Sequence, residues 1–185
     1  MSGAEDVMVR RAVAGFLMLG LAGCMGPAGK MPRSPLMGEG ELAPDFTLPD
    51  AHGGTVTLSD AEKNGPVLLI FYLGYSCPRC VEHLRSVSDR IDEFKKLGTT
   101  VLAVSPDTLA ETRDSVRTYD EDFSFPLLSD PDKSVARRYG MAPPGATMLH
   151  GVFVIDRRGV IRFAARGAHP FGDVDALLAK VKAAS

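Results

Sequence analysis

The fold of this chain is decided by residues 66–80, which read PVLLIFYLGYSCPRC. The first part, 67–72, is a run of six apolar residues bounded by proline and glycine, which predicts a strand buried on both faces of a sheet. Cys77 and Cys80 follow, and the residues after Cys77 have helical spacing. The stretch therefore predicts a strand, a short loop and a helix, with a dithiol where the helix begins.

The position of the dithiol determines its expected chemistry. The free N–H groups and the dipole of a helix N-terminus favour an anion, so a cysteine there becomes a nucleophilic thiolate near neutral pH. Pro78 suits the first helical turn, and Arg79 adds positive charge beside Cys77 and Cys80. Stabilising the reduced form of a dithiol raises its reduction potential. We therefore expect the Cys77–Cys80 pair to be less reducing than thioredoxin, whose reduction potential is about -270 mV.

A C-x-x-C motif can also be half of a zinc site. A structural zinc site normally takes four protein ligands, usually with a second close pair. The chain has three cysteines and no second pair. We therefore expect a redox dithiol, with Cys77 and Cys80 as catalytic residues and no cofactor.

The rest of the chain predicts the elements that surround this unit. Residues 46–48 (FTL) and 55–58 (TVTL) flank a Gly53-Gly54 turn and predict a β-hairpin. Capping-box spacing at 59–62 and 108–111 predicts two helix starts. The helix after Cys77 is expected to run to about Lys96. Further strands are expected at 101–104, 125–128, 152–155 and 160–164, and further helices at 132–139 and around 174–181. This order predicts an α/β fold with a mixed central sheet flanked by helices.

Composition limits the possible partners. The chain has 185 residues, 45% of them hydrophobic, with a net charge of -2, which suits one globular core. No basic run of five or more residues occurs, so we expect no nucleic-acid partner.

Residues 1–23 have the pattern of a secretory signal. Arg10 and Arg11 precede an uncharged apolar run, 12–22, which is too short for a bilayer span. The run ends in LAGC at 21–24, which resembles the lipobox of bacterial lipoproteins and implies cleavage before Cys24 and lipidation of that cysteine. Residues 24–40, rich in Gly and Pro, are expected to be a flexible tether, and 41–185 the folded domain.

The lipoprotein resemblance also implies a location. A lipid anchor at Cys24 would hold the domain in the cell envelope, at the periplasmic face of a membrane. Lipoproteins retained at the inner membrane often carry Asp after the cysteine, and Met25 at that place favours the outer membrane.

From Gly40 to about Val181 the sequence resembles the alkyl hydroperoxide reductase/thiol-specific antioxidant (AhpC/TSA) family. The matching motifs are APDFTL at 43–48, VTLSD at 56–60, Phe71-Tyr72 and FVID at 153–156. The resemblance implies a peroxiredoxin-type thioredoxin-like fold with an N-terminal hairpin, and a thiol-dependent oxidoreductase with antioxidant activity.

The family pattern gives one reading of the site. Matched from Phe71-Tyr72, Leu73 stands at the usual Pro position, Cys77 at the Thr position and Cys80 at the peroxidatic position, while His150 stands where peroxiredoxins carry Arg. In this reading Cys80 becomes a sulfenic acid and Cys77 resolves it.

Thioredoxin-type reductases give the opposite assignment, with the first cysteine attacking a disulfide and the second resolving the mixed disulfide. Cys77 would then be the nucleophile. We take thiol-disulfide exchange as the main expectation and peroxidase activity as its alternative. Both imply a disulfide or peroxide substrate and a reducing partner.

A third resemblance is to Sco-type copper chaperones. GYSCP at 74–78 and the distant His150 echo their motifs, which implies Cys77, Cys80 and His150 as an alternative copper site. We expect Met141 and Met148 to pack in loops or the core, and His83 to be a solvated helix residue.

Overall fold

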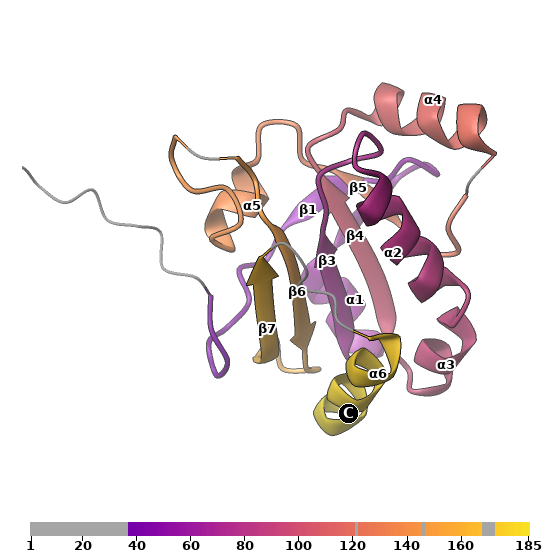
Figure 1. Cartoon of the computed structure of the whole chain (residues 1–185). Coiled ribbons are helices and arrows are strands. Elements are labelled where there is room, and N and C mark those ends of the chain that lie inside the picture. Colours follow the sequence, from indigo (N-terminus) through magenta and orange to yellow (C-terminus); the bar gives the residue numbers. More distant parts are fainter. Residues whose placement is uncertain (1–36, 121, 146, 168–172) are drawn as a thin grey trace, which may run out of the picture. The chain divides into compact units, whose positions relative to one another are not determined.

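The computed structural model describes residues 37–120, 122–145, 147–167 and 173–185. The centre of this part is a five-stranded sheet in the order β5-β4-β3-β6-β7 (Figure 1). Its strands are β3 (Val67–Phe71), β4 (Thr100–Ser105), β5 (Leu127–Ser129), β6 (His150–Ile155) and β7 (Ile161–Gly167). The predicted hairpin is confirmed as a separate two-stranded sheet of β1 (Thr47–Pro49) and β2 (Thr55–Thr57).

The sheet is mixed, as predicted. β3, β4 and β5 run parallel, whereas β6 is antiparallel to both β3 and β7. The carboxyl ends of the three parallel strands therefore share an edge with the first residue of β6. The side chains that carry the chemistry lie at this edge.

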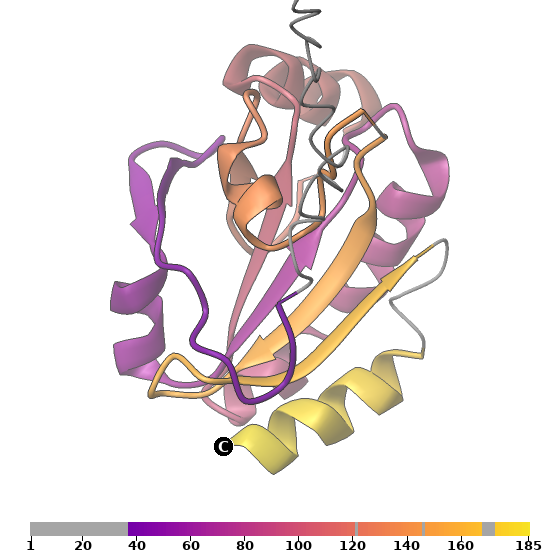
Figure 2. The same cartoon turned by 90° about the vertical axis from the view of Figure 1, so that its left-hand side faces the viewer.

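Helices cover both faces of the sheet (Figures 1 and 2). They are α1 (Leu58–Asn64), α2 (Pro78–Ser88), α3 (Ile91–Lys96), α4 (Leu109–Tyr119), α5 (Ser134–Arg138) and α6 (Val174–Ala184). Alternate residues of β3 face opposite sides, since a strand has a side-chain period of two. Leu68 and Ile70 pack with residues of α2, α3 and α6, while Leu69 and Phe71 pack with residues of α1 and α5.

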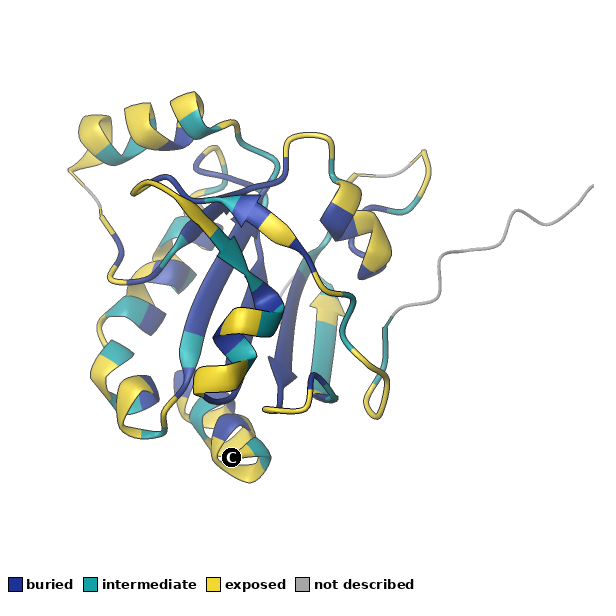
Figure 3. Ribbon diagram, turned by 180° about the vertical axis from the view of Figure 1, so that it is seen from behind, coloured by how far each residue is buried: buried dark blue, intermediate teal, exposed yellow. Residues whose placement is uncertain are grey.

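The central strands are buried on both faces, as the apolar run predicted. Every residue of β3 is buried, and Figure 3 shows the inner strands in the colour of buried residues. The core is thus two apolar layers separated by the sheet, and β3 contributes to both. This burial holds the end of β3, and the loop that follows it, in place.

The helix expected to run from Cys77 to about Lys96 is instead two helices. α2 ends at Ser88, α3 begins at Ile91, and Arg90 between them has a non-helical backbone. The Arg90 guanidinium pairs with Glu93 and also lies 2.8 Å from Asp175 Oδ1, at the start of α6. The break is thus accompanied by a tertiary ion pair that no local pattern encodes.

The two predicted helix starts behave differently. Thr108 and Glu111 form the expected reciprocal capping box of α4. The box expected at 59–62 is wrong, because α1 begins at Leu58 and its N-cap is Thr57, two residues before Ser59. The Ser59 N–H instead donates to Asp45 Oδ1 at 3.0 Å. A side chain from another segment thus replaces the local cap.

The predicted signal peptide, Cys24 and most of the tether lie outside the described residues. From the end of the predicted tether, the Gly40 N–H donates to Ile161 O at 2.8 Å. No helix in the described part of the chain is long and apolar enough to cross a membrane.

Candidate active site

The dithiol lies where β3 leads into α2. Cys77 is the N-cap of α2, with an extended backbone, and Pro78 occupies the first turn as expected. The Cys77 N–H donates to Gly74 O at 3.2 Å, which closes a turn between the strand and the helix. The first cysteine is therefore at the positive end of a helix of 11 residues.

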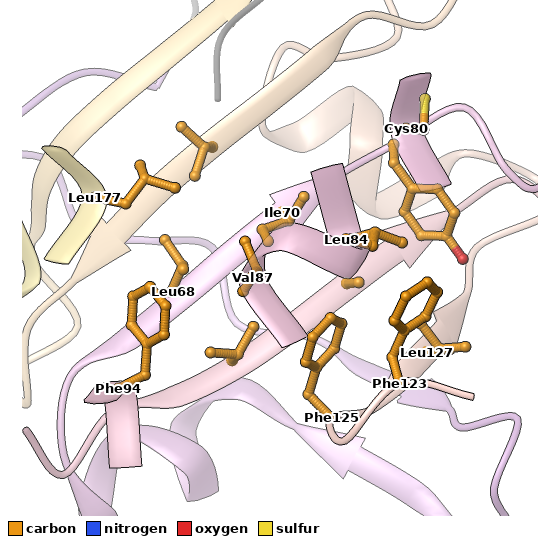
Figure 4. Close-up of a cluster of buried hydrophobic side chains, with 14 of the residues drawn as sticks. Leu68, Ile70, Cys80, Leu84, Val87, Phe94, Phe123, Phe125, Leu127 and Leu177 are labelled. Carbon is orange, nitrogen blue, oxygen red and sulfur yellow. The ribbon is translucent and has the colours of Figure 1, made fainter. Parts of the chain in front are cut away.

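Cys77 and Cys80 are joined by a disulfide, with their Cα atoms 5.3 Å apart. Cys80 is fully buried, whereas Cys77 is partly exposed. Figure 4 shows Cys80 on α2 in the same buried cluster as Leu84 and Val87. The pair thus has an inner and an outer sulfur, and the outer one belongs to Cys77.

The structure brings His150 to the dithiol. β6 pairs antiparallel with β3, and Gly151 lies opposite Phe71, so His150 reaches the end of β3 that leads to Cys77. His150 Nε2 lies 3.0 Å from Cys80 Sγ and 3.6 Å from Cys77 Sγ. The imidazole is therefore in contact with both sulfurs and closer to the buried one.

The other ring nitrogen of His150 indicates the tautomer. Nδ1 lies 3.3 Å from the carbonyl oxygen of Gly167, the last residue of β7. A carbonyl oxygen can only accept, so Nδ1 carries the proton in that contact. In the neutral ring, the lone pair of Nε2 is then directed at the two sulfurs, where it can take a proton from a thiol.

Asp107 supports the loop that precedes Cys77. Its Oδ2 accepts from the Tyr75 N–H at 2.9 Å, and its carboxylate occupies the space that a Cβ on Gly74 would need. Gly74 has φ of 93°, a backbone conformation that favours glycine. Burial raises the pKa of Asp107, while the Tyr75 N–H opposes that shift. The sequence analysis did not identify Asp107, because this residue lies in the segment after β4, far along the chain from Tyr75, and the two meet only in the folded protein.

His83 is not the solvated residue that we expected. It is partly buried one turn after Cys80, with Nε2 shielded from solvent. Burial, together with nearby His150, lowers the pKa of His83 to about 4. The ring is therefore uncharged at neutral pH.

The remaining candidates lie at different depths. Arg79 is exposed in the first turn of α2. Met141 and Met148 are buried in the core on the far face of the sheet, which agrees with their expected packing role.

A groove of about 380 Å³ lies beside the outer cysteine, between α2 and the end of α4. Pro78 and Val81 contribute to one side, and the rings of Tyr75 and Tyr119 stack at 6.4 Å with an angle of 4° between their planes. Its size is in the range that small organic molecules occupy.

Comparisons with known proteins agree on one family. The model of the AhpC/TSA family matches residues 40–164. The chain is 33% identical over 156 residues to a protein named "Putative peroxiredoxin" of Mycobacterium tuberculosis, with 78% of this chain and 94% of that protein covered. It is also 35% identical over 130 residues to a peroxiredoxin of Thermoplasma volcanium, covering 67% of this chain and 63% of that protein.

Solved structures give the same result. The crystal structure of peroxidoxin BcpB from Mycobacterium tuberculosis superposes with a TM-score of 0.71 at 27% identity, covering 80% of this chain and 99% of that one. A mutant of Xanthomonas campestris peroxiredoxin Q gives a TM-score of 0.69 at 26% identity, covering 80% and 99%. The fold expected from the sequence is thereby confirmed as a peroxiredoxin-type thioredoxin-like fold.

Proposed function

Because this chain belongs to the AhpC/TSA family, we propose that it is a peroxiredoxin-type thiol peroxidase in which Cys80 attacks the peroxide. The family makes the chain a thiol-dependent oxidoreductase. The comparisons favour peroxide chemistry over the disulfide exchange that we had taken as the main expectation. Cys77 is then the resolving cysteine.

The observation that carries the proposal is the contact between His150 and Cys80. In the disulfide form Nε2 lies 3.0 Å from Cys80 Sγ, a distance that suits proton transfer once reduction makes Cys80 a thiol, and Cys80 stands at the peroxidatic position of the family pattern. The resulting imidazolium and the N-terminus of α2 both stabilise the thiolate. His150 thus supplies positive charge at the place where other members carry Arg.

The catalytic cycle has two steps before the disulfide is reduced again. The Cys80 thiolate attacks the near oxygen of ROOH, the O–O bond breaks, and Cys80 becomes a sulfenic acid while ROH leaves with the proton held by His150. The Cys77 thiol then attacks the sulfenic sulfur, which forms the disulfide and releases water. The helical spacing of the two cysteines, with Cα atoms 5.3 Å apart, allows this second step within one turn of α2.

Reduction of the disulfide begins at the outer sulfur, which belongs to Cys77. A reducing dithiol approaches the disulfide from solvent and therefore meets Cys77, the partly exposed partner. Its thiolate attacks Cys77 Sγ, and Cys80 leaves as a thiolate stabilised by His150. A second thiol of the reductant then displaces Cys77, so that two electrons enter in each cycle.

Thiol-disulfide exchange is the second candidate, and it is favoured by the burial of Cys80 beneath a partly exposed Cys77. In that case Cys77 attacks a substrate disulfide and Cys80 resolves the mixed disulfide. The two candidates use the same residues in opposite order.

Trapping experiments separate them. In the Cys77→Ser variant, one equivalent of hydroperoxide should produce a dimedone-reactive sulfenate on Cys80. The Cys80→Ser variant should consume peroxide no faster than the double variant does. If Cys80→Ser captures a substrate disulfide on Cys77 while neither single variant forms a sulfenate, the protein is a disulfide reductase rather than a peroxidase.

We also propose that the enzyme works in the cell envelope, anchored through Cys24. The LAGC motif at 21–24 supports this, and it lies outside the described residues. Expression in a bacterium fed a labelled fatty acid should label the wild-type chain, while Cys24→Ser should stay unlabelled. Equal labelling of both would refute the anchor.

A further inference from the structure

We propose that the groove beside Cys77 is the docking surface for a protein dithiol that reduces the Cys77–Cys80 disulfide. The need for such a partner rests on the proposed function, in which every cycle leaves this disulfide to be reduced. The groove adds the place where the reductant binds and the kind of partner that fits, which is a protein whose attacking thiol lies in an apolar surface patch.

The depths of the two sulfurs determine where the reductant must bind. Cys80 is fully buried, whereas Cys77 is partly exposed. Reduction requires a thiolate to reach one sulfur of the disulfide, so the incoming thiolate meets Cys77 Sγ. A protein that carries this thiolate therefore covers the surface around Cys77 during the reaction.

The groove lies directly along that surface. Val81 is one turn after Cys77 on the same side of α2, and its N–H donates to Cys77 O at 3.2 Å. Pro78 and Val81 line the groove from α2, and Tyr119, the last residue of α4, lines it from the other side. An apolar side chain next to the partner's thiol can therefore enter the groove while that thiol is at Cys77 Sγ.

Tyr119 is the side chain in the groove that a partner would cover. It is 63% exposed, and Tyr119 and Leu42 are the two exposed large hydrophobic residues in the described part of the chain. Its ring lies parallel to the ring of Tyr75, which belongs to the loop before Cys77. Tyrosine is enriched in protein interfaces and among the residues that dominate binding energy. Covering Tyr119 would remove apolar surface from water and so favour association.

A protein fits this surface better than a small thiol does. A small thiol can reach Cys77 Sγ without contacting Tyr119, so it gains nothing from the groove. Transient redox complexes bury less than about 1,200 Å² in total, so the groove and its surroundings are large enough to support one. Glu82 and Arg85, further along α2, are exposed and add charges of both signs to the lining, which can orient a partner.

Docking would accelerate a balanced exchange of thiols. The partner's thiolate attacks Cys77 Sγ, and the Cys77–Cys80 bond breaks with its electron pair on Cys80, which leaves a mixed disulfide on Cys77. The partner's second thiol then displaces Cys77, so the partner departs as a disulfide and both cysteines are reduced. The groove contributes to the first attack, because it holds the two reacting sulfurs together.

The test compares the rates at which thioredoxin and dithiothreitol reduce the disulfide form. Thioredoxin is a protein dithiol, whereas dithiothreitol is a small dithiol without a surface to dock. We expect thioredoxin to reduce the wild-type disulfide at least about tenfold faster. Tyr119→Ser should slow the reaction with thioredoxin about tenfold and leave the reaction with dithiothreitol unchanged. Leu42→Ser is the matched control, since it removes the other exposed large hydrophobic side chain, and it should react as the wild type does.

The reaction with dithiothreitol shows whether a variant has disturbed the dithiol itself. The proposal is overturned if Tyr119→Ser leaves the thioredoxin rate unchanged, if it slows both reductants equally, or if thioredoxin reduces the wild type no faster than dithiothreitol does. It is also overturned if Tyr119→Ser slows only the attack of the reduced protein on cumene hydroperoxide, since the groove then holds the organic part of a substrate. The reduction rates are measured without peroxide, so they do not depend on whether the protein is a peroxidase.

Discussion

Gly151 of β6 is paired with Phe71 of β3, and this pairing places His150 against the dithiol. A shift of the register by one residue would turn the histidine to the opposite face of the sheet, away from α2. Gly151 also constrains which side of β6 faces α2, because a Cβ at this position would overlap the sulfur of buried Met141. The catalytic geometry thus depends on the strand register as well as on the cysteines.

Replacing His150 should impair the first chemical step. His150→Ala removes the base that lies 3.0 Å from Cys80 Sγ, so the thiolate fraction falls and the reaction with peroxide slows about 10²-fold. Single-turnover kinetics across a range of pH should show the largest deficit near neutrality, with recovery at alkaline pH as the thiol ionises unaided. His52→Gln is the control and should react as the wild type does. A loss smaller than twofold would contradict the role of His150 as a base.

The reduction potential of the dithiol should lie above thioredoxin's value of about -270 mV. The N-terminus of α2 and the neighbouring Arg79 and His150 all favour the thiolate, which stabilises the reduced form. Equilibration with glutathione or dithiothreitol buffers, followed by thiol alkylation, measures the potential. A value at or below that of thioredoxin would show that burial of Cys80 outweighs these charges.

Gly74→Ala should destabilise the protein and disturb the dithiol. The positive φ costs about 1–3 kcal/mol for a residue with a Cβ, and the new atom also meets the Asp107 carboxylate. Urea denaturation gives the loss of unfolding free energy, and the alkylation rate of Cys77 reports on the loop. The matched control is Gly53→Ala, which has φ of 119° but nothing within 4 Å of the added atom. Equal losses at both positions would show that the Asp107 contact adds nothing.

Glu62 should make the protein less stable as the pH rises from about 4.5 to 7. Burial, together with Asp45 and Asp156, raises the pKa of Glu62 to about 7. In that window the unfolded chain loses this proton while the folded chain keeps it, so rising pH favours unfolding. Glu62→Gln should therefore raise Tm at pH 8 and leave it nearly unchanged at pH 4. A Tm that falls by the same amount at both pH values would point to a lost contact instead.

Local patterns predicted most elements of the fold, because the pattern of apolar residues reports burial directly. The apolar run at 67–72 is β3, and the box at 108–111 caps α4. The patterns failed where a distant side chain competes with a local signal. Asp45 replaces the expected cap of α1, and the pairing of Arg90 with Asp175 accompanies the break between α2 and α3.

His83 shows the same limit within the site. The sequence predicted a solvated helix residue, but the burial of a helix face depends on what packs over it, and His83 is partly buried. Asp107 is a further case, since its contact with Tyr75 joins residues from two different loops.

By itself, the sequence determined the dithiol, its position at a helix start and an α/β fold with a mixed sheet, because these depend on residue types and spacing along the chain. The thioredoxin-like class came from the resemblance of its motifs to the AhpC/TSA family. Only the tertiary structure decided that Cys80 is the buried sulfur and Cys77 the outer one. It also decided that His150 contacts both of them. These relationships join segments about 70 residues apart through the β3–β6 hydrogen bonds, whose register is selected by burial of both faces of the sheet.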